Sequence, residues 1–367
     1  MRARGIAYDT GFIYQGSVSR ERFDPEVVER ELAIIRDDLH CNAVQVTGGD
    51  PGRLEVAARI AAELGLEVWF SPCPLQLTPE EILALLADCA ERAERLRKTG
   101  AEVVFVAGIE LTIMDRGFAP GDTQQERLAW LLGGSGRPER LREVSARLND
   151  FLVRAVAEIR QRFAGRITYA SIPFERPDWT LFDIVAVELI RNAAVAGQYR
   201  DGVRRLVAGG TPVAITGFGA CAYAGASDRG ARAMEIAEYD EATQTPLRLD
   251  GVYTRDEAGQ AADIREVLEI FDAEGVDSAF VWLFELCNFP HRPDGDPRLD
   301  LDMASPAIVK TLEGRHGDTY PDMTWEPKAA FAAIADRYRH GRLGRHGTRG
   351  RWTVTRRAGS VRNDSRI

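Results

Sequence analysis

Eight short apolar runs, rich in β-branched and aromatic residues, alternate with amphipathic stretches of helical periodicity along this chain. This alternation is typical of a parallel sheet wrapped by helices. The eight predicted strands are Gly5–Tyr8, Ala43–Thr47, Glu67–Ser71, Val103–Gly108, Ile167–Ser171, Ile184–Leu189, Pro212–Thr216 and Ala279–Phe284. Eight such units favour a single (β/α)8 TIM barrel. An open doubly wound sheet is the alternative, but no G-x-G-x-x-G sequence follows the first strand to bind a dinucleotide.

The predicted helices between these strands carry recognisable start and stop signals. Asp24-Pro25 and Asp50-Pro51 place an N-cap before a first-turn proline, and Thr78-Pro79-Glu80-Glu81 reads as a capping box. Gly65 and Gly100 follow two helix ends, where a left-handed C-cap favours glycine.

The domain organisation is predicted from length and composition. Residues 1–340 of the 367 form one barrel, whereas residues 341–367 carry eight arginines and few apolar side chains, which predicts a disordered basic tail. Two connections are long for a barrel, Leu111–Pro138 after the fourth strand and Ala220–Glu257 after the seventh. Each follows a carboxyl strand end and forms either a wall over the site or a plain surface excursion.

Net charge and cysteine content restrict the partners and cofactors that we expect. A net charge of −9 and an isoelectric point near 5.3 argue against nucleic acid as a partner. No signal peptide and no apolar run of membrane-spanning length is found, so we expect no membrane partner and a cytoplasmic protein.

The five cysteines, odd in number and without C-x-x-C spacing, predict no disulfide framework. His40 beside Cys41 falls short of the three or four ligands that a fixed metal needs, so we expect neither metal nor cofactor, and a small molecule as substrate. Oligomeric state is left open.

Glu110 is the predicted catalytic residue. In a barrel, polar side chains at the carboxyl ends of strands face the open mouth. Glu110 follows the apolar run "EVVFVAGI", and such surroundings raise the pKa of a carboxyl group, as a general acid requires. The alternative is an ordinary loop carboxylate in a salt bridge.

Other residues near the strand ends are substrate-binding candidates. They are Asp9, Gln45, Thr47, Glu175, Glu188, Arg191, Gly217, Tyr223, Trp282 and Glu285. Strand alternation puts Trp282 on the face of Phe280 and Phe284, which is either barrel core or a stacking platform for a ring. Asp9 either binds a neighbouring loop or points at the ligand.

The pattern resembles the clan of retaining glycoside hydrolases built on a TIM barrel. In that clan an acid/base glutamate ends strand four and a nucleophilic glutamate ends strand seven, often within T-E-F-G. The resemblance places the acid/base at Glu110 in "GIEL", whereas the strand-seven match is "TGFG", with Gly217 in place of the nucleophile.

Most of residues 1–340 also resembles a family of actinobacterial barrel proteins, often labelled hypothetical or abortive-infection-like. The matching segments are "IRDDLHCNAVQVTGGD", "EVWFSPCP", "LLADCAERAERLR", "DLDMAS" and "YPDMTWEPKAAFAA". The resemblance implies glutamate at position 217, arginine at position 45 and aromatics near Leu189 and Ile190, all of which differ here.

Three functions follow from these observations. The first is a repurposed glycosidase-like enzyme without the usual nucleophile, in which Glu110 drives elimination, rearrangement or cyclisation of a small natural product or glycosylated metabolite. The second is a glycoside hydrolase with an inverting or otherwise altered mechanism, its second carboxyl group supplied by Asp9, Glu175, Glu188 or Glu285. The third is a non-catalytic small-molecule-binding protein on the same scaffold.

Overall fold

A closed barrel of eight parallel strands forms the centre of the computed structural model, which describes residues 1–340. Around the barrel the strand order is β1-β12-β9-β8-β7-β6-β5-β4, and β4 closes the ring on β1. Their bounds are β1 (Ala3–Asp9), β4 (Ala43–Gly48), β5 (Glu67–Pro72), β6 (Val103–Ile109), β7 (Arg166–Ser171), β8 (Val185–Glu188), β9 (Val213–Phe218) and β12 (Ser278–Val281). The predicted TIM barrel is thus confirmed, and the open sheet was the wrong alternative.

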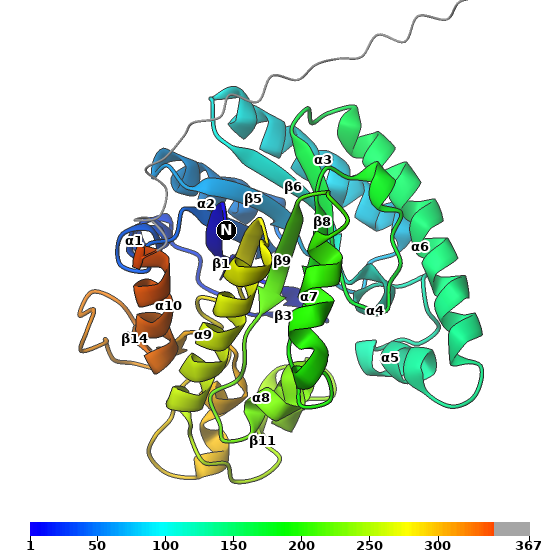
Figure 1. Cartoon of the computed structure of the whole chain (residues 1–367). Coiled ribbons are helices and arrows are strands. Elements are labelled where there is room, and N and C mark those ends of the chain that lie inside the picture. The colour runs from blue at the N-terminus through cyan, green and yellow to red at the C-terminus, as the bar shows by residue number, and fades with distance from the viewer. Residues whose placement is uncertain (341–367) are drawn as a thin grey trace, which may run out of the picture.

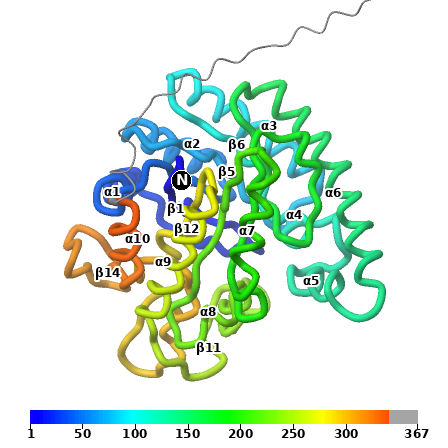
Figure 2. The backbone as a smooth tube through the Cα atoms, viewed as in Figure 1, coloured from blue at the N-terminus to red at the C-terminus, as the bar shows by residue number. Residues whose placement is uncertain are grey.

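Helices cover the outside of the barrel (Figure 1). They are α1 (Pro25–Asp37), α2 (Pro51–Glu63), α3 (Pro79–Lys98), α6 (Arg137–Arg160), α7 (Tyr199–Val207), α9 (Glu257–Glu274) and α10 (Ala329–His340). Between β7 and β8 a single 3-10 turn, η1 (Trp179–Leu181), takes the place of a helix. The last helix, α10, packs beside α9 (Figure 2), and Tyr338 on it donates a hydrogen bond of 3.1 Å to the carbonyl of Gly5 in β1.

The predicted helix signals act as expected. Asp24 and Asp50 accept hydrogen bonds from the first turns of α1 and α2, and Thr78 forms a capping box with Glu81 at the start of α3. Gly65 and Gly100 have φ values of 80° and 97°, in the left-handed region that favours glycine. No helix within residues 1–340 is long and apolar enough to cross a membrane.

The barrel interior is a packed core near the amino ends of the strands. Trp69 and Phe280 pack there with tilted rings whose centroids lie 4.7 Å apart, and alanines of several strands surround them. Gly5 is required beside them because a Cβ at this position would lie 2.4 Å from the Phe280 ring. The outward-facing residues of the strands join a larger core with the helices.

Three excursions, not two, follow the carboxyl ends of strands. The first carries α4 (Leu111–Met114) and α5 (Gln124–Leu132), and the second carries α8 (Ala226–Arg229), η3 (Gly230–Ile236), β10 (Ala237–Tyr239) and β11 (Pro246–Leu249). The third, missed from the sequence, runs between β12 and α10 and holds η4 (Pro297–Leu299), η5 (Leu301–Ala304), β13 (Val309–Thr311) and β14 (Trp325–Pro327). The smaller elements elsewhere are β2 (Ile13–Tyr14), β3 (Ser17–Val18) and η2 (Ala196–Gln198).

The excursions gather at the lower end of the barrel in Figure 1, where α5, α8 and β11 are labelled. The second and third share a hydrophobic core of their own, in which Tyr223, Leu249, Phe289 and Met303 are buried. They therefore form a packed wall on the barrel rather than a plain surface excursion. The predicted basic tail, 341–367, lies outside the described residues.

Strand eight differs from its prediction. It ends at Val281 rather than Phe284, and the regular alternation of side chains does not continue beyond the strand. Phe280 accordingly faces the barrel interior, whereas Phe284 packs in the layer between strands and helices. The expectation that Trp282 shares one face with both rings was wrong for Phe284.

Candidate active site

Polar side chains line the barrel interior near the carboxyl ends of the strands. On β4, Val44 and Val46 pack toward the helices and Ala43 faces the interior, so Gln45 and Thr47 face the interior as well. The same alternation on β8 and β9 turns Glu188 and Thr216 inward, two residues after the interior alanines Ala186 and Ala214. The interior thus changes from apolar to polar toward the carboxyl ends of the strands.

Glu110 stands at the end of β6, in a distorted segment. The pairing of β6 with β7 shifts register between Val106 and Ile109, as at a β-bulge, and Gly108 has a φ of 108°. Glu110 itself adopts a left-handed φ of 48°, uncommon for a residue with a side chain. Its N–H donates to the carbonyl of Ala170 at 2.9 Å, and it is the N-cap residue of α4.

Glu175 braces this segment from the loop after β7. One carboxylate oxygen accepts hydrogen bonds from the N–H and the hydroxyl of Thr112, at 3.2 and 2.6 Å. The other accepts from the Tyr169 hydroxyl at 2.9 Å and from the N–H of Ile172 at 3.2 Å. The Tyr169 oxygen in turn accepts from the N–H of Leu111 at 2.9 Å. Glu175 therefore holds the turn immediately after Glu110.

Gly217 owes its identity to Glu188. Its φ lies outside the left-handed region, so the backbone does not require a glycine. A Cβ built on Gly217 would lie 1.6 Å from Oε2 of Glu188 and 2.7 Å from its Cδ. Glu188 and Gly217 are paired across β8 and β9. The carboxylate of Glu188 thus occupies the space of a residue-217 side chain.

Glu110 and Glu188 interact electrostatically. Burial raises the pKa of Glu110 well above its usual range, and the nearby carboxylates of Glu188 and Glu175 raise it further. Burial raises the pKa of Glu188 to about 7, against a smaller opposing effect of Thr216. Oε1 of Glu188 is buried without a hydrogen-bond partner. Two carboxyl groups with such pKa values can hold one proton between them near neutral pH, as an acid/base pair requires.

Gln45 and Thr47 present further polar atoms to the interior. The Gln45 side chain donates a hydrogen bond of 3.3 Å to the Ser71 hydroxyl on β5, and its Oε1 is buried without a partner. Within the described residues the Thr47 hydroxyl also lacks a partner, whereas the Thr216 hydroxyl lies beside Glu188, whose pKa it lowers. Such atoms commonly mark a place that a polar ligand or water occupies.

Asp9 and Glu285 are bound to their surroundings. The carboxylate of Asp9 accepts from the N–H of Gly11 and the hydroxyl of Ser19, both at 2.6 Å. Glu285 forms a buried ion pair with Arg20 at 3.0 Å and accepts from Thr311 at 2.8 Å. Burial raises the pKa of Glu285 to about 7 even though Arg20 opposes this effect.

The three remaining candidates each contact a different part of the structure. Arg191 pairs with Asp263 and Glu266 of α9, at 2.7 and 2.8 Å. Tyr223 is buried in the wall and donates to the carbonyl of Ala233 at 3.1 Å. Trp282 is half-buried and its ring centroid lies 5.6 Å from that of Phe12.

Arg20 and Tyr169 were not predicted as parts of this region. Arg20 bridges Glu31 and Glu285, each at 3.0 Å, across 265 residues of sequence in the second case. Tyr169 lies within β7 and its hydroxyl reaches the turn after Glu110. Neither position carries a local signal, because both contacts arise only when the barrel closes.

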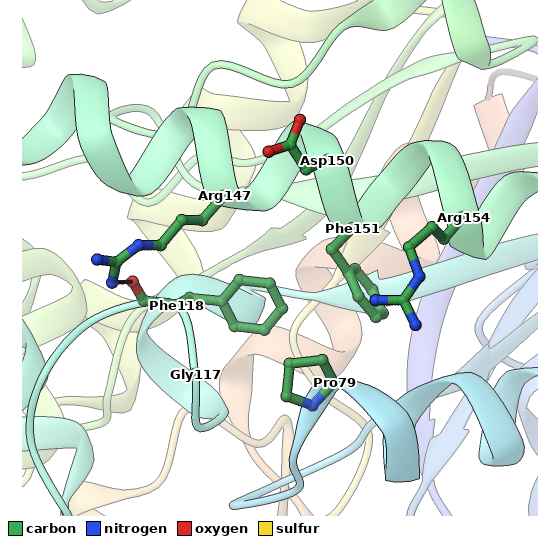
Figure 3. Close-up of a pocket in the computed structure, with 7 residues that line it drawn as sticks. All are labelled: Pro79, Gly117, Phe118, Arg147, Asp150, Phe151 and Arg154. Carbon is green, nitrogen blue, oxygen red and sulfur yellow. Dashed lines mark hydrogen bonds between the residues drawn. The ribbon is translucent and has the colours of Figure 1, made fainter.

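A separate pocket of about 200 Å³ lies on the helical layer (Figure 3). Its lining residues come from the start of α3, from α6 and from the first excursion: Pro79, Gly117, Phe118, Arg147, Asp150, Phe151 and Arg154. Arg147 donates to the carbonyl of Phe118 at 3.1 Å. None of these residues belongs to a barrel strand, so this pocket is distinct from the site at the strand ends.

Comparison with models of known protein families finds no match, and neither does comparison with curated protein sequences. Several solved structures are similar. A GH113 β-1,4-mannanase aligns with a TM-score of 0.58 and 14% identity, over 92% of this chain and 99% of that chain. The GH113 β-mannanase of Alicyclobacillus acidocaldarius aligns with a TM-score of 0.53 and 14% identity, over 92% of this chain and 97% of that chain.

A β-glucuronidase of Parabacteroides merdae aligns with a TM-score of 0.54 and 14% identity, over 92% of this chain and 37% of that chain. At these identities the likeness concerns the fold. The chain therefore shares the TIM-barrel fold of these structures, and any chemistry depends on its own residues.

Proposed function

We propose that this protein is a repurposed glycosidase-like enzyme that acts on a small natural product or a glycosylated metabolite. Glu110 is the general acid and Glu188 its ionised partner, while Gly217 stands where the resemblance expects a nucleophile. The observation that carries the proposal is the Glu188 carboxylate, which fills the side-chain space of Gly217 and interacts with Glu110. The site therefore keeps two carboxyl groups, although strand β9 supplies neither.

An elimination illustrates how the pair works. Glu110 donates its proton to a leaving oxygen as the carbon–oxygen bond breaks. Glu188 takes a proton from the adjacent carbon, whose electrons form the new double bond. After the reaction Glu110 is ionised and Glu188 is protonated, and proton exchange with solvent restores the starting state. Rearrangement and cyclisation use the same proton donor and acceptor.

Glycoside hydrolysis with an altered mechanism is the second candidate, and the place of Glu188 favours it. A retaining course needs carboxyl groups about 5–5.5 Å apart, and an inverting course needs about 6.5–9.5 Å. Glu188, reaching from β8 over Gly217, would then attack the anomeric carbon or activate a water molecule.

The test uses metabolite extract from the source cells and a panel of aryl glycosides. Wild-type protein and the variants Glu110→Gln and Glu188→Gln are incubated with each, and products are followed by mass spectrometry and by aryl release. We expect products with wild-type protein that each variant reduces at least ~100-fold, the usual scale of a general acid. Glu143→Gln, an exposed helical position, is the matched control.

Aryl release would select glycoside hydrolysis, whereas new products in the extract alone would select the other acid/base chemistry. Turnover unchanged in Glu110→Gln would refute both. Ligands that stabilise the fold without chemical change would favour a non-catalytic binding protein.

A further inference from the structure

We infer that the mouth of the barrel selects a neutral or ammonium-bearing ligand rich in hydroxyl groups, and rejects one that carries a carboxylate. This inference rests on the proposed function, since it concerns the same site. It adds a charge preference and a class of ligand.

The first support is the lack of counter-charge at the site. Within residues 1–340, no Lys or Arg forms an ion pair with Glu110, Glu175 or Glu188. Burial raises the pKa of the Cys73 thiol, and the nearby carboxyl groups of Asp115, Glu110, Asp9 and Glu188 raise it further. Since Glu110 and Glu188 hold one proton between them near neutral pH, one negative charge stays on the pair, and an anionic ligand meets like charge there.

The second support is that the two buried arginines of residues 1–340 are already bound. Arg20 pairs with Glu31 and Glu285, each at 3.0 Å. Arg127 donates to the carbonyls of Ile113, Gly121 and Met114 and to the Gln76 side chain. A ligand carboxylate would have to break such contacts to obtain a cation.

The third support is independent of charge and comes from hydrogen bonding. Oε1 of Gln45 and Oε1 of Glu188 are buried acceptors without partners, on β4 and β8. An acceptor is satisfied only by a donor, and a ligand hydroxyl or ammonium provides one. The Thr47 hydroxyl, which has no partner within the described residues, can donate or accept beside them. β4 and β8 lie on opposite sides of the barrel, so these polar atoms face the barrel interior from both sides.

The experiment compares three matched probes: D-glucose, D-glucosamine and D-glucuronate. Their binding near neutral pH is measured by isothermal titration and by ligand-observed NMR. We expect D-glucosamine to bind at least as tightly as D-glucose, and D-glucuronate at least ~10-fold more weakly. Equal or tighter binding of D-glucuronate overturns the inference, as does the absence of binding by all three.

Two variants locate the preference at this site. Glu188→Gln keeps the shape but removes the charge, so we expect the advantage of D-glucosamine to fall and the penalty of D-glucuronate to shrink. Gln45→Arg adds a cation to the interior, so D-glucuronate should gain affinity. Glu143→Gln should leave the ranking unchanged, and a ranking unchanged in Glu188→Gln overturns the inference.

Failure of this inference is distinguishable from failure of the proposed function. Binding of the three probes is measured without turnover, and Glu110→Gln is included to remove the general acid. An intact charge ranking with turnover unaffected by Glu110→Gln would refute the function alone. Loss of the ranking with turnover still dependent on Glu110 would refute the inference alone.

Discussion

At the scale of single residues, the environment of Glu110 is built by two other carboxyl groups. Glu188 supplies a nearby charge, and Glu175 supplies both charge and the hydrogen bonds that hold the following turn. Together with burial, the charges of Glu188 and Glu175 keep Glu110 protonated at a pH where an exposed glutamate is ionised. The charge of Glu188 and the positioning role of Glu175 can be tested separately by substituting each residue alone.

Replacing Glu188 by Gln should lower the pKa of Glu110, because it removes the largest like-charge effect while burial remains. Carbon-13 NMR of labelled glutamate carboxyl groups measures the titration directly and needs no substrate. Glu143→Gln should leave the titration of Glu110 unchanged. A Glu110 pKa equal in Glu188→Gln and wild type would show that the two groups do not interact.

Replacing Glu175 by Gln should act through position more than through charge. Its side chain can still accept from Thr112, but an amide cannot accept on both sides as the carboxylate does. We expect kcat to fall and the substrate KM to change little, since the turn that carries Glu110 loosens. A purely structural role would lower the melting temperature without changing the pH profile of kcat, so both are recorded.

At the scale of elements, the barrel follows from the sequence because each strand is short, apolar and bounded by cap and turn signals. All eight strands were predicted, although strand β12 ends three residues earlier than expected. The excursion after β12 was missed because its elements are short and its core forms with the preceding excursion. The place of Glu110 at the mouth was predictable from its strand end. The role of Gly217 was not, since it depends on a side chain from the neighbouring strand.

The pair of β8 and β9 can be tested by adding one methyl group. Gly217→Ala should displace the Glu188 carboxylate, because the added Cβ and Oε2 cannot share one position. We expect turnover to fall at least ~10-fold and the pKa of Glu110 to decrease. Gly202→Ala in α7 is the control, since nothing lies within 4 Å of its Cβ.

The double variant Glu188→Ala with Gly217→Glu moves the carboxylate from β8 to β9. We expect aryl glycoside cleavage to appear or increase if the rest of the site suits a sugar. Gly217→Glu alone should be inactive and less stable, because two carboxylates would compete for one space. Activity in the single variant would contradict the packing of Glu188 over Gly217.

At the scale of the whole molecule, the barrel buries several carboxyl groups that prefer to be protonated. Burial raises the pKa of Glu188 and Glu285 to about 7 each, and that of Asp115 to about 8. The folded state therefore holds more protons than the unfolded chain between the ordinary carboxyl range and about pH 8. Stability is lost as the pH rises through this window.

We accordingly expect the melting temperature to fall by several degrees between weakly acidic and weakly alkaline buffer. Glu188→Gln should flatten this decrease, because a neutral amide has no proton to lose. Differential scanning calorimetry across the window measures both effects. A melting temperature that rises with pH over the same range would contradict raised pKa values at these groups.

The exchange between Glu188 and Gly217 separates two properties that sequence patterns treat as one: the residue to which a functional group is attached, and the point in space where the group ends. Adjacent strand ends of a barrel are close enough for either to supply the same volume. A motif search at the end of β9 finds glycine at position 217, whereas a molecule bound there would contact the carboxylate of Glu188. Catalytic positions in barrels of this kind are better compared by the location of their terminal atoms than by the column of an alignment.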